Sequence, residues 1–262
     1  MSGRVRDDAV QLRDESRETL TFQILGVRFH RYTRRQAVEQ ILHWMAEKSP
    51  RMVITAGPEF VMMAKQQPEV LRMAQRADLV TPDGIGVVWA ARRQGRPVEE
   101  RVTGVELVLD LLETAQQRGE KSRVYVLGAR PEVLENCLAV MRQRYPGLEF
   151  AGRDGYFSAE DTEGVVQEIA AFAPSIWLVG LGQPRQERFI VEWHGSLPPC
   201  VAIGVGGSID VWSGAVKRAP AIFRKLNMEW LYRLLKQPSR WRRQLALPRF
   251  AWQVLRGADR RS

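Results

Sequence analysis

The stretch that decides the fold is "SIWLVGLGQPRQERFIVEWHGSLPPCVAIGVGG", residues 175–207. It begins with an almost continuously apolar run at 175–182, continues with a helical run at 184–193, and returns to a second apolar run at 200–207. Short apolar strands separated by helices are typical of a parallel sheet that is covered on both faces. The stretch therefore predicts a β–α–β unit in which each strand ends in glycine.

The same alternation of strand and helix extends from this unit toward the N-terminus. Further strands are expected over 21–29 (a strand or short hairpin), 51–55, 78–81, 123–129 and 148–155. Helices are expected over 33–47, 58–66, 68–77, 104–118, 131–144, 158–172 and 208–213, with another running from the turn at 82–84 to about 93. Thr103 and Ser158 are expected to cap two of these helices. The predicted fold class is α/β: a parallel-sheet, Rossmann-like core over 21–216.

Composition narrows the class of protein. The 262 residues are 45% hydrophobic and 26% charged, which allows a sizeable core. The two cysteines, Cys137 and Cys200, lack metal-ligand spacing, so both are expected in the core of a protein kept in a reducing compartment. Residues 1–20 form a polar arm without the apolar centre of a signal peptide, and no apolar run approaches the about 18 residues of a spanning helix. A cytoplasmic protein is expected.

The positive charge is concentrated at the C-terminal end. The chain carries a net charge of +9, but residues 217–262 alone hold 13 Lys and Arg against 2 Asp and Glu. Apolar residues recur there at helical spacing, which predicts a basic appendage of two or three helices broken by Pro238 and Pro248. Interleaved aromatic residues suit an anionic membrane surface. Single-stranded nucleic acid and an ordinary solvated helix face are the alternatives, although no named nucleic-acid motif is visible.

Three expected strands end in glycine-rich turns: "VLGARPE" (126–132), "GLGQPRQ" (180–186) and "GVGGSID" (204–210). In an open parallel sheet, ligands bind at the carboxyl ends of the strands, and glycine lets a phosphate approach the backbone closely. None of the three is a G-x-G-x-x-G, and the chain has no G-x-x-x-x-G-K-[ST], so a P-loop is excluded. Each turn alone could be merely structural, but several at one sheet edge favour a nucleotide site.

Asp83 stands in "LVTPDGIGVVWA" (79–90), between a proline and a glycine at the end of an expected strand. Two interpretations are open. The carboxylate could cap the helix that follows Pro82, or it could act as a base at the sheet edge where ligands bind.

Other charged residues near expected strand ends are Asp154, Glu187 and Asp210, and they form no metal cluster. The three histidines are scattered, and no serine nucleophile elbow is present. The sequence therefore offers one well-placed carboxylate rather than a catalytic pair or a metal set.

With these residues in view, the chain resembles the bacterial WecG/TagA/CpsF glycosyltransferases from about 22 to 255. The resemblance rests on several motifs in order along the chain: "TPDGIGVVW", "ERVTGVEL", "YVLGARPEV", "YPGLEFAGRDGYF", "GLGQPRQERFI", "GVGGSIDVWSGAVKRAP" and "MEWLYRLLKQPSRWRRQ". Because so many ordered motifs coincide, a chance match is very improbable.

The resemblance implies inverting, metal-independent transfer of a sugar from a UDP donor, without a cofactor. The implied acceptor is a polyprenyl-diphosphate-linked sugar on the cytoplasmic membrane face, in cell-surface polysaccharide synthesis. A peripheral protein on that inner face is therefore expected. The donor sugar stays open between N-acetylmannosamine, its uronic acid and glucose, and a homo-oligomer is compatible with the family.

The resemblance also implies site residues. Asp83 matches the family's proposed base, and Thr55 lies in "TAGPE", where Gly57 stands at a position that is usually Asn in the family. The catalytic residues expected from the resemblance are Asp83, Thr55 and Arg233. Substrate contacts are expected from Gly84, Gly128, Asp154, Gly155, Gly182, Gln186, Glu187, Gly206, Gly207, Asp210, Arg240 and Arg243.

Two other functions compete with this assignment. A nucleotide-dependent oxidoreductase would use the same sheet edge, but the missing dinucleotide fingerprint argues against it. A non-catalytic nucleic-acid or membrane adaptor would use the basic segment alone.

Overall fold

The computed structural model describes residues 20–216, 220, 223, 232 and 245–257. The strands are β1 (Thr21–Ile24), β2 (Val27–His30), β3 (Arg51–Ala56), β4 (Leu79–Pro82), β5 (Arg123–Gly128), β6 (Glu149–Arg153), β7 (Ile176–Gly180) and β8 (Val201–Gly204). The helices are α2 (Arg34–Ala46), α3 (Pro58–Gln66), α4 (Pro68–Arg76), α5 (Ile85–Arg93), α6 (Gly104–Gln117), α7 (Pro131–Arg144), α8 (Thr162–Phe172), α9 (Arg185–Trp193), α10 (Ser208–Trp212) and α14 (Ala246–Leu255), with a 3₁₀ turn at His194–Ser196.

Six strands form one parallel sheet in the order β4–β3–β8–β7–β5–β6. The predicted β–α–β unit is present as β7, α9 and β8, and it lies at the centre of this sheet. The predicted hairpin at 21–29 is also present, as β1 and β2, which pair in antiparallel fashion and pack beside β4. The α/β fold class expected from the sequence is therefore confirmed.

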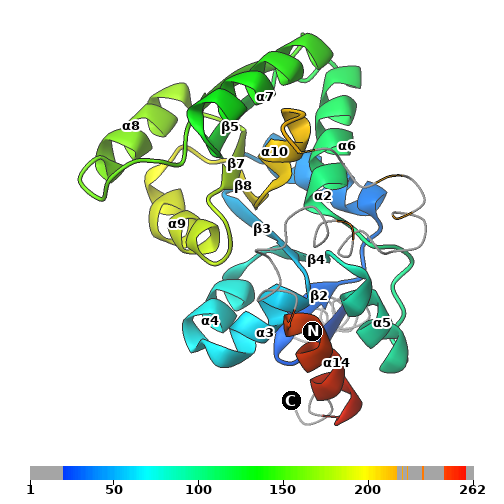
Figure 1. Cartoon of the computed structure of the whole chain (residues 1–262). Coiled ribbons are helices and arrows are strands. Elements are labelled where there is room, and N and C mark those ends of the chain that lie inside the picture. The colour runs from blue at the N-terminus through cyan, green and yellow to red at the C-terminus, as the bar shows by residue number, and fades with distance from the viewer. Residues whose placement is uncertain (1–19, 217–219, 221–222, 224–231, 233–244, 258–262) are drawn as a thin grey trace, which may run out of the picture.

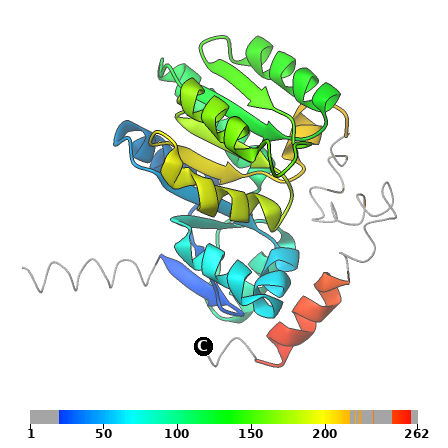
Figure 2. The same cartoon turned by 90° about the vertical axis from the view of Figure 1, so that its left-hand side faces the viewer.

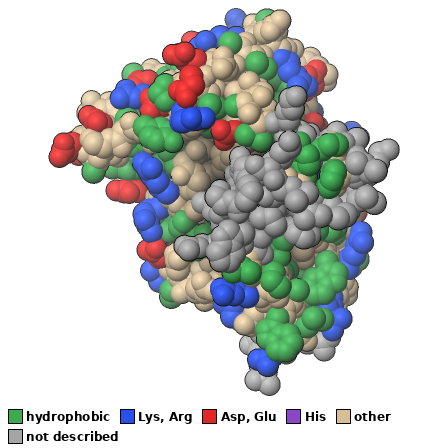
Figure 3. Space-filling view, in the orientation of Figure 1, with side chains coloured by type: hydrophobic (Ala, Val, Ile, Leu, Met, Phe, Trp, Pro, Cys, Tyr) green, Lys and Arg blue, Asp and Glu red, His purple; other side chains and the backbone are tan. Residues whose placement is uncertain are grey.

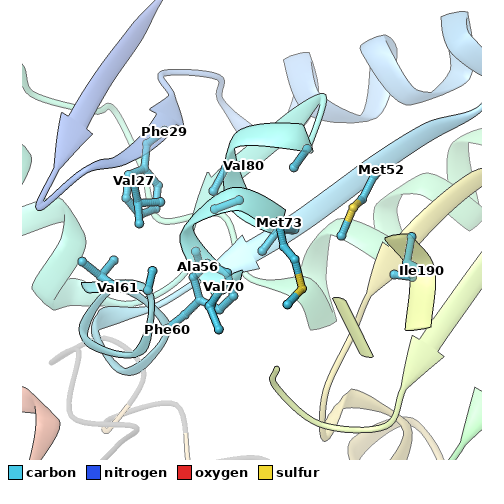
Figure 4. Packing of buried hydrophobic residues seen from close by; sticks show 14 of the residues in the cluster. Val27, Phe29, Met52, Ala56, Phe60, Val61, Val70, Met73, Val80 and Ile190 are labelled. Atoms are coloured by element: carbon cyan, nitrogen blue, oxygen red, sulfur yellow. The ribbon is translucent and has the colours of Figure 1, made fainter. Parts of the chain in front are cut away.

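Alternate residues of each strand face opposite helical layers, as the strand period of two requires. In β3, Met52 belongs to one apolar cluster and Val53 to the other. The first cluster joins the sheet to the hairpin, α3, α4, α5, α8, α9 and α14, and Figure 4 shows Phe29 and Phe60 within it. The second cluster joins the sheet to α2, α6, α7 and α10. Figure 1 shows the two helical layers on either side of the strands.

The connections after neighbouring strands leave toward opposite layers. The chain passes from β3 to α3 on one face, but from the adjacent β8 to α10 on the other. In open α/β sheets, such a divergence opens a crevice at the carboxyl ends of the strands, and ligands bind there. The topology therefore selects the β3–β8 edge as the place to look for chemistry.

Most expected helix starts agree with the structure, with one correction. Thr103 accepts a hydrogen bond from the Glu106 amide and caps α6. Ser158 does not cap α8, because that helix begins at Thr162. The hydroxyl group of Ser158 instead donates to the Asp161 carboxylate and accepts from the Asp161 amide. These bonds close a separate turn and delay the helix by about one turn.

The C-terminal helix α14 packs on the core. It contacts α3 and α5 (Figures 1 and 2). Its Phe250 and Val254 side chains are buried in the first apolar cluster. Pro248, expected to break a helix, lies in the first turn of α14, where its missing amide N–H needs no partner. Residues 1–19 and most of 217–244 lie outside the described residues, so the polar arm and the helical appendage over 217–262 stay predictions.

Candidate active site

The carboxyl edge of the sheet gathers most of the predicted site residues. Thr55 lies near the end of β3, Asp83 follows β4, and Gly206 follows β8. Gly128 ends β5, and Gly182 follows β7. Parallel pairing places these five strand ends side by side, although their positions in the sequence are up to 151 residues apart.

Asp83 is not the N-cap residue of the helix that follows it. The N-cap of α5 is Gly84. Instead, the Asp83 backbone amide donates to the Ala56 carbonyl at 3.0 Å, and Oδ2 accepts from the Gly104 amide at a long 3.4 Å. Gly104 is the first residue of α6, so the carboxylate of Asp83 faces the positive end of a different helix. The N-cap position expected for Asp83 is thus taken by Gly84, and bonds to the end of β3 and the start of α6 hold Asp83 at the sheet edge.

Gly57 is required by a close approach of two backbone segments. A Cβ atom at Gly57 would lie 2.7 Å from the Asp83 carbonyl oxygen. Gly84 has φ +121°, a conformation that disfavours any side chain. The "TAGPE" and "TPDG" turns are therefore packed backbone to backbone, and the absence of a side chain at Gly57 fits this contact.

Thr55 joins β3 to the neighbouring strand ends. Its hydroxyl group donates to the Gly204 carbonyl at 3.4 Å, and its own carbonyl accepts from the Gln183 amide group at 3.2 Å. A Cβ atom at Gly104 would lie 3.1 Å from Thr55 Oγ1. Thr55 and Asp83 thus both border Gly104, and the structure brings the two predicted catalytic side chains to one place.

Gln186 and Glu187 lie beneath the edge, not on its surface. They are 1% and 0% exposed in the first turn of α9. Gln186 Nε2 donates to Glu187 Oε1 at 2.7 Å, and Gln186 Oε1 accepts from the Gly206 amide at 2.9 Å. Burial raises the pKa of Glu187 to about 7, against smaller opposing effects of the Gln186 side chain, its own backbone amide and the Gln183 side chain. Any contact of these two side chains with a substrate would be indirect.

The β5–β6–β7 part of the edge is built from close backbone contacts. A Cβ atom at Gly128 would lie 2.5 Å from the Gly180 carbonyl oxygen, and one at Gly155 would lie 3.2 Å from Gly128 Cα. Gly182 has φ +80° and open space beside it. The carboxylate of Asp154 accepts from the Tyr156 amide at 2.9 Å and shapes the local turn. This part of the edge offers backbone groups rather than catalytic side chains.

The turn after β8 contains the remaining described candidates. Gly206 adopts φ +51°, and Gly207 is exposed. Asp210 lies on α10, which contacts α7. Its charge adds to the burial that raises the pKa of Cys137, a buried residue of α7, to about 12. Asp210 is therefore oriented partly toward the second helical layer.

Three predicted arginines, Arg233, Arg240 and Arg243, lie outside the described residues, so their roles stay predictions. Within the part of the chain that the structure describes, no group of three or more His, Cys, Asp or Glu side chains could hold a metal ion. The same part contains no helix long and apolar enough to cross a membrane.

Sequence reasoning did not select two residues that the structure places at the edge. Gln183 bonds to Thr55, and Gly104 bonds to Asp83. Gln183 lies in the glycine-rich turn "GLGQPRQ" (180–186), so this motif could have indicated that it belongs to the site. Gly104 had no comparable local signal, because its role depends on the docking of α6 against β4.

Comparison with known proteins shows the family of this chain. The model of the glycosyl transferase WecG/TagA/CpsF family matches residues 22–262. The chain belongs to this family. The match confirms the family expected from the motifs and makes the protein a glycosyltransferase.

Two curated relatives of this glycosyltransferase are named N-acetylglucosaminyldiphosphoundecaprenol N-acetyl-beta-D-mannosaminyltransferase. The protein of Bacillus spizizenii (strain ATCC 23059 / NRRL B-14472 / W23) is 40% identical over 214 residues, covering 81% of this chain and 82% of its own. The protein of Staphylococcus aureus (strain MW2) is 39% identical over 243 residues, covering 92% of this chain and 94% of its own. The similarity to both relatives therefore spans most of the edge described above.

Proposed function

We propose that this glycosyltransferase moves N-acetylmannosamine from a UDP donor to N-acetylglucosamine carried on a polyprenyl diphosphate, in cell-surface polysaccharide synthesis. The names of the relatives support the acceptor and the transferred sugar. The observation that carries the proposal is the position of Asp83, held between the end of β3 and the first residue of α6 at the carboxyl edge. A carboxylate held at that position suits a reaction that needs one base.

Asp83 would act as the general base. It would accept the proton of an acceptor hydroxyl group while that oxygen attacks the anomeric carbon from the face opposite UDP. The bond between the anomeric carbon and the UDP oxygen breaks as the new glycosidic bond forms, so the configuration inverts in one step. Thr55 lies beside Gly104, the residue whose amide bonds to Asp83, and would help to orient the acceptor.

The departing UDP needs positive charge or hydrogen-bond donors around its phosphates. We assign this role to Arg233, Arg240 and Arg243, whose forked guanidinium groups match phosphate oxygens. The glycine turns at Gly128, Gly182 and Gly206 would let the nucleotide approach the backbone. Such a site would work without a metal ion, and activity should persist in EDTA.

A lipid-linked acceptor requires contact with the membrane, and the described part of the C-terminal segment offers a suitable face. Trp252 and Leu255 of α14 are 54% and 51% exposed, and Trp89 of α5 is also exposed. Hydrophobic side chains gather over this end of the molecule with Lys and Arg beside them (Figure 3). Arg256 lies over the Trp252 ring at 4.4 Å. Exposed tryptophan beside cations suits the headgroup region of an anionic membrane, which favours a peripheral enzyme on the cytoplasmic face.

The deciding experiment is a transfer assay with UDP-N-acetylmannosamine and a synthetic prenyl-diphosphate N-acetylglucosamine, with and without EDTA. We expect a disaccharide product with inverted anomeric configuration and undiminished turnover in EDTA. UDP-glucose and UDP-N-acetylmannosaminuronic acid are the competing donors to run in parallel. A clear preference for either would refute the proposed sugar but keep the reaction class, whereas retention of configuration would refute the single-base mechanism.

A further inference from the structure

We propose that Glu187 is a positioning residue: its buried carboxyl group orients the Gln186 amide, which in turn holds the turn between β8 and α10 at the carboxyl edge. Glu187 and Gln186 do not reach the surface, so neither would touch substrate. The inference deepens the proposed function, because the turn that they hold lies beside Thr55 and Gly180.

The direction of each hydrogen bond in this relay is fixed by chemistry. The Gly206 amide can only donate, so the Gln186 atom 2.9 Å away must be the carbonyl oxygen. The other end of the Gln186 side chain is then the NH₂ group, and it donates to Glu187 Oε1 at 2.7 Å. Glu187 is therefore required as an acceptor, and an apolar residue at this position would leave the Gln186 donor unsatisfied.

The turn held by Gln186 contacts two other strand ends. The Gly204 carbonyl accepts from the Thr55 hydroxyl group, and the Gly206 carbonyl oxygen lies 3.0 Å from the position of a Cβ atom at Gly180. Gly204 itself must lack a side chain, because its Cβ atom would lie 2.6 Å from Gln186 Nε2. A shift of Gln186 would thus displace backbone that packs against both β3 and β7.

Burying the carboxyl group of Glu187 costs more free energy than burying a neutral hydrogen-bond acceptor would. It is fully buried, and its second oxygen, Oε2, has no hydrogen-bond partner among the described residues. Besides burial, the neutral amide side chains of Gln186 and Gln183 influence the pKa of Glu187, and both act to lower it. A buried group of this kind titrates near neutral pH, which gives the positioning role a signature that a passive core residue would lack.

Two variants and one control test the inference. Gln186→Met keeps the length of the side chain but removes both hydrogen bonds. Glu187→Gln keeps an acceptor for Gln186 but cannot ionise. Glu192→Gln is the matched control, because Glu192 is an exposed carboxylate on the same helix.

The first measurement is amide hydrogen exchange of the segment 201–212 in the ligand-free protein, with UDP affinity by calorimetry as the second. For Gln186→Met we expect at least tenfold faster exchange at 204–208 and at least tenfold weaker UDP binding. For the wild type we expect the protection factor at 204–208, with the intrinsic pH dependence of amide exchange divided out, to fall as pH rises from 6 to 8, because ionisation of the buried carboxyl group favours an opened, hydrated turn. The pH dependence should vanish in Glu187→Gln and persist in Glu192→Gln.

The inference is overturned if Glu187→Gln keeps the pH dependence of the wild type, or if a folded Gln186→Met exchanges at 204–208 and binds UDP within twofold of the wild type. Should Gln186→Met not fold, the pH comparison of Glu187→Gln with the wild type decides alone. The exchange measurement needs no substrate. Failure of the transfer assay would therefore refute the proposed function without touching this inference.

Discussion

The two halves of the carboxyl edge are built differently: side chains border the β3–β4 half, whereas backbone contacts form the β5–β6–β7 half. At the β3–β4 half, side chains of Thr55 and Asp83 border the start of α6. At the β5–β6–β7 half, Gly128 and Gly155 bring backbone against backbone, and Asp154 merely shapes a turn. In the described residues, the first half thus places side chains at the edge, and the second is built from closely packed backbone with open space beside Gly182. The difference supports the proposal that the β3–β4 half carries the reaction and the β5–β6–β7 half binds the nucleotide.

The sharpest way to break this comparison is to neutralise one aspartate in each half. Asp83→Asn should lower kcat by about 10²–10⁴-fold, the usual contribution of a general base, because the amide cannot accept the proton. Asp154→Asn should change kcat by less than about threefold, since an asparagine side chain also accepts in such turns. Steady-state transfer kinetics measure both, and circular dichroism checks that each variant is folded. Equal losses in the two variants would abolish the distinction between the halves.

Alanine at the two crowded glycines should separate stability from activity. Gly128→Ala should destabilise by at least about 3 kcal/mol, because its φ of +137° and the Gly180 carbonyl 2.5 Å away both oppose a Cβ atom. Gly57→Ala meets only the Asp83 carbonyl, at an ordinary φ of −96°, and should cost less stability but displace the base. We expect at least about a tenfold loss of kcat for this second variant, since misplacement by 1 Å can cost about 10²-fold.

The control for both substitutions is Gly164→Ala, where a Cβ atom meets open space in α8. It should be neutral or stabilising by up to about 1 kcal/mol, because alanine favours a helix. Denaturant titration gives the stabilities. If Gly57→Ala were as unstable as Gly128→Ala and yet fully active, the β3–β4 turn would be structural only.

Glu187 lies under the boundary between the halves, and its ionisation should appear in the stability of the protein. Its pKa rises from 4.5 to about 7 on folding, so the folded state holds the proton more tightly than the unfolded state. The stabilising contribution is therefore full below pH 4.5 and is lost as pH rises through 7, a change of at most about 3 kcal/mol.

Glu187→Gln should remove that dependence. Its free energy of unfolding, relative to the wild type, should increase between pH 5 and pH 8, as measured by urea titration at each pH. The control is again Glu192→Gln, which should follow the wild type throughout. A constant difference between Glu187→Gln and the wild type across this range would show that Glu187 does not titrate there.

The smallest stability effect is expected for the exposed face of α14, the helix that packs on α3 and α5. Trp252→Ala should change the free energy of unfolding by less than about 0.5 kcal/mol, because the ring is mostly exposed. It should nevertheless weaken binding to vesicles that contain phosphatidylglycerol. Phe250→Ala, in the buried face of the same helix, should cost about 3–5 kcal/mol. Unaltered vesicle binding by Trp252→Ala would remove this face from the membrane contact.

Much of the fold followed from local patterns. Apolar runs ending in glycine predicted the central strands, and Thr33 and Thr103 marked helix starts that the structure confirms. The start of α8 was missed, because Ser158 and Asp161 close their own turn. Pro248 was read as a break, although a proline in the first turn is compatible with a helix. Both errors concern where a helix begins, which depends on the hydrogen bonds of only a few residues.

The sequence by itself determined the α/β class, the family and the position of Asp83 at a strand end, because strand period, glycine turns and ordered motifs are properties of neighbouring residues. Only the tertiary structure decided what Asp83 faces. The carboxylate of Asp83 accepts from the amide of Gly104, which lies 21 residues away in the sequence. The hydrogen bonds from Glu187 through Gln186 to Gly206 likewise join α9 to the turn after β8. Contacts of this kind depend on the order of strands in the sheet and on the packing of helices, which hydrophobic pattern alone does not specify.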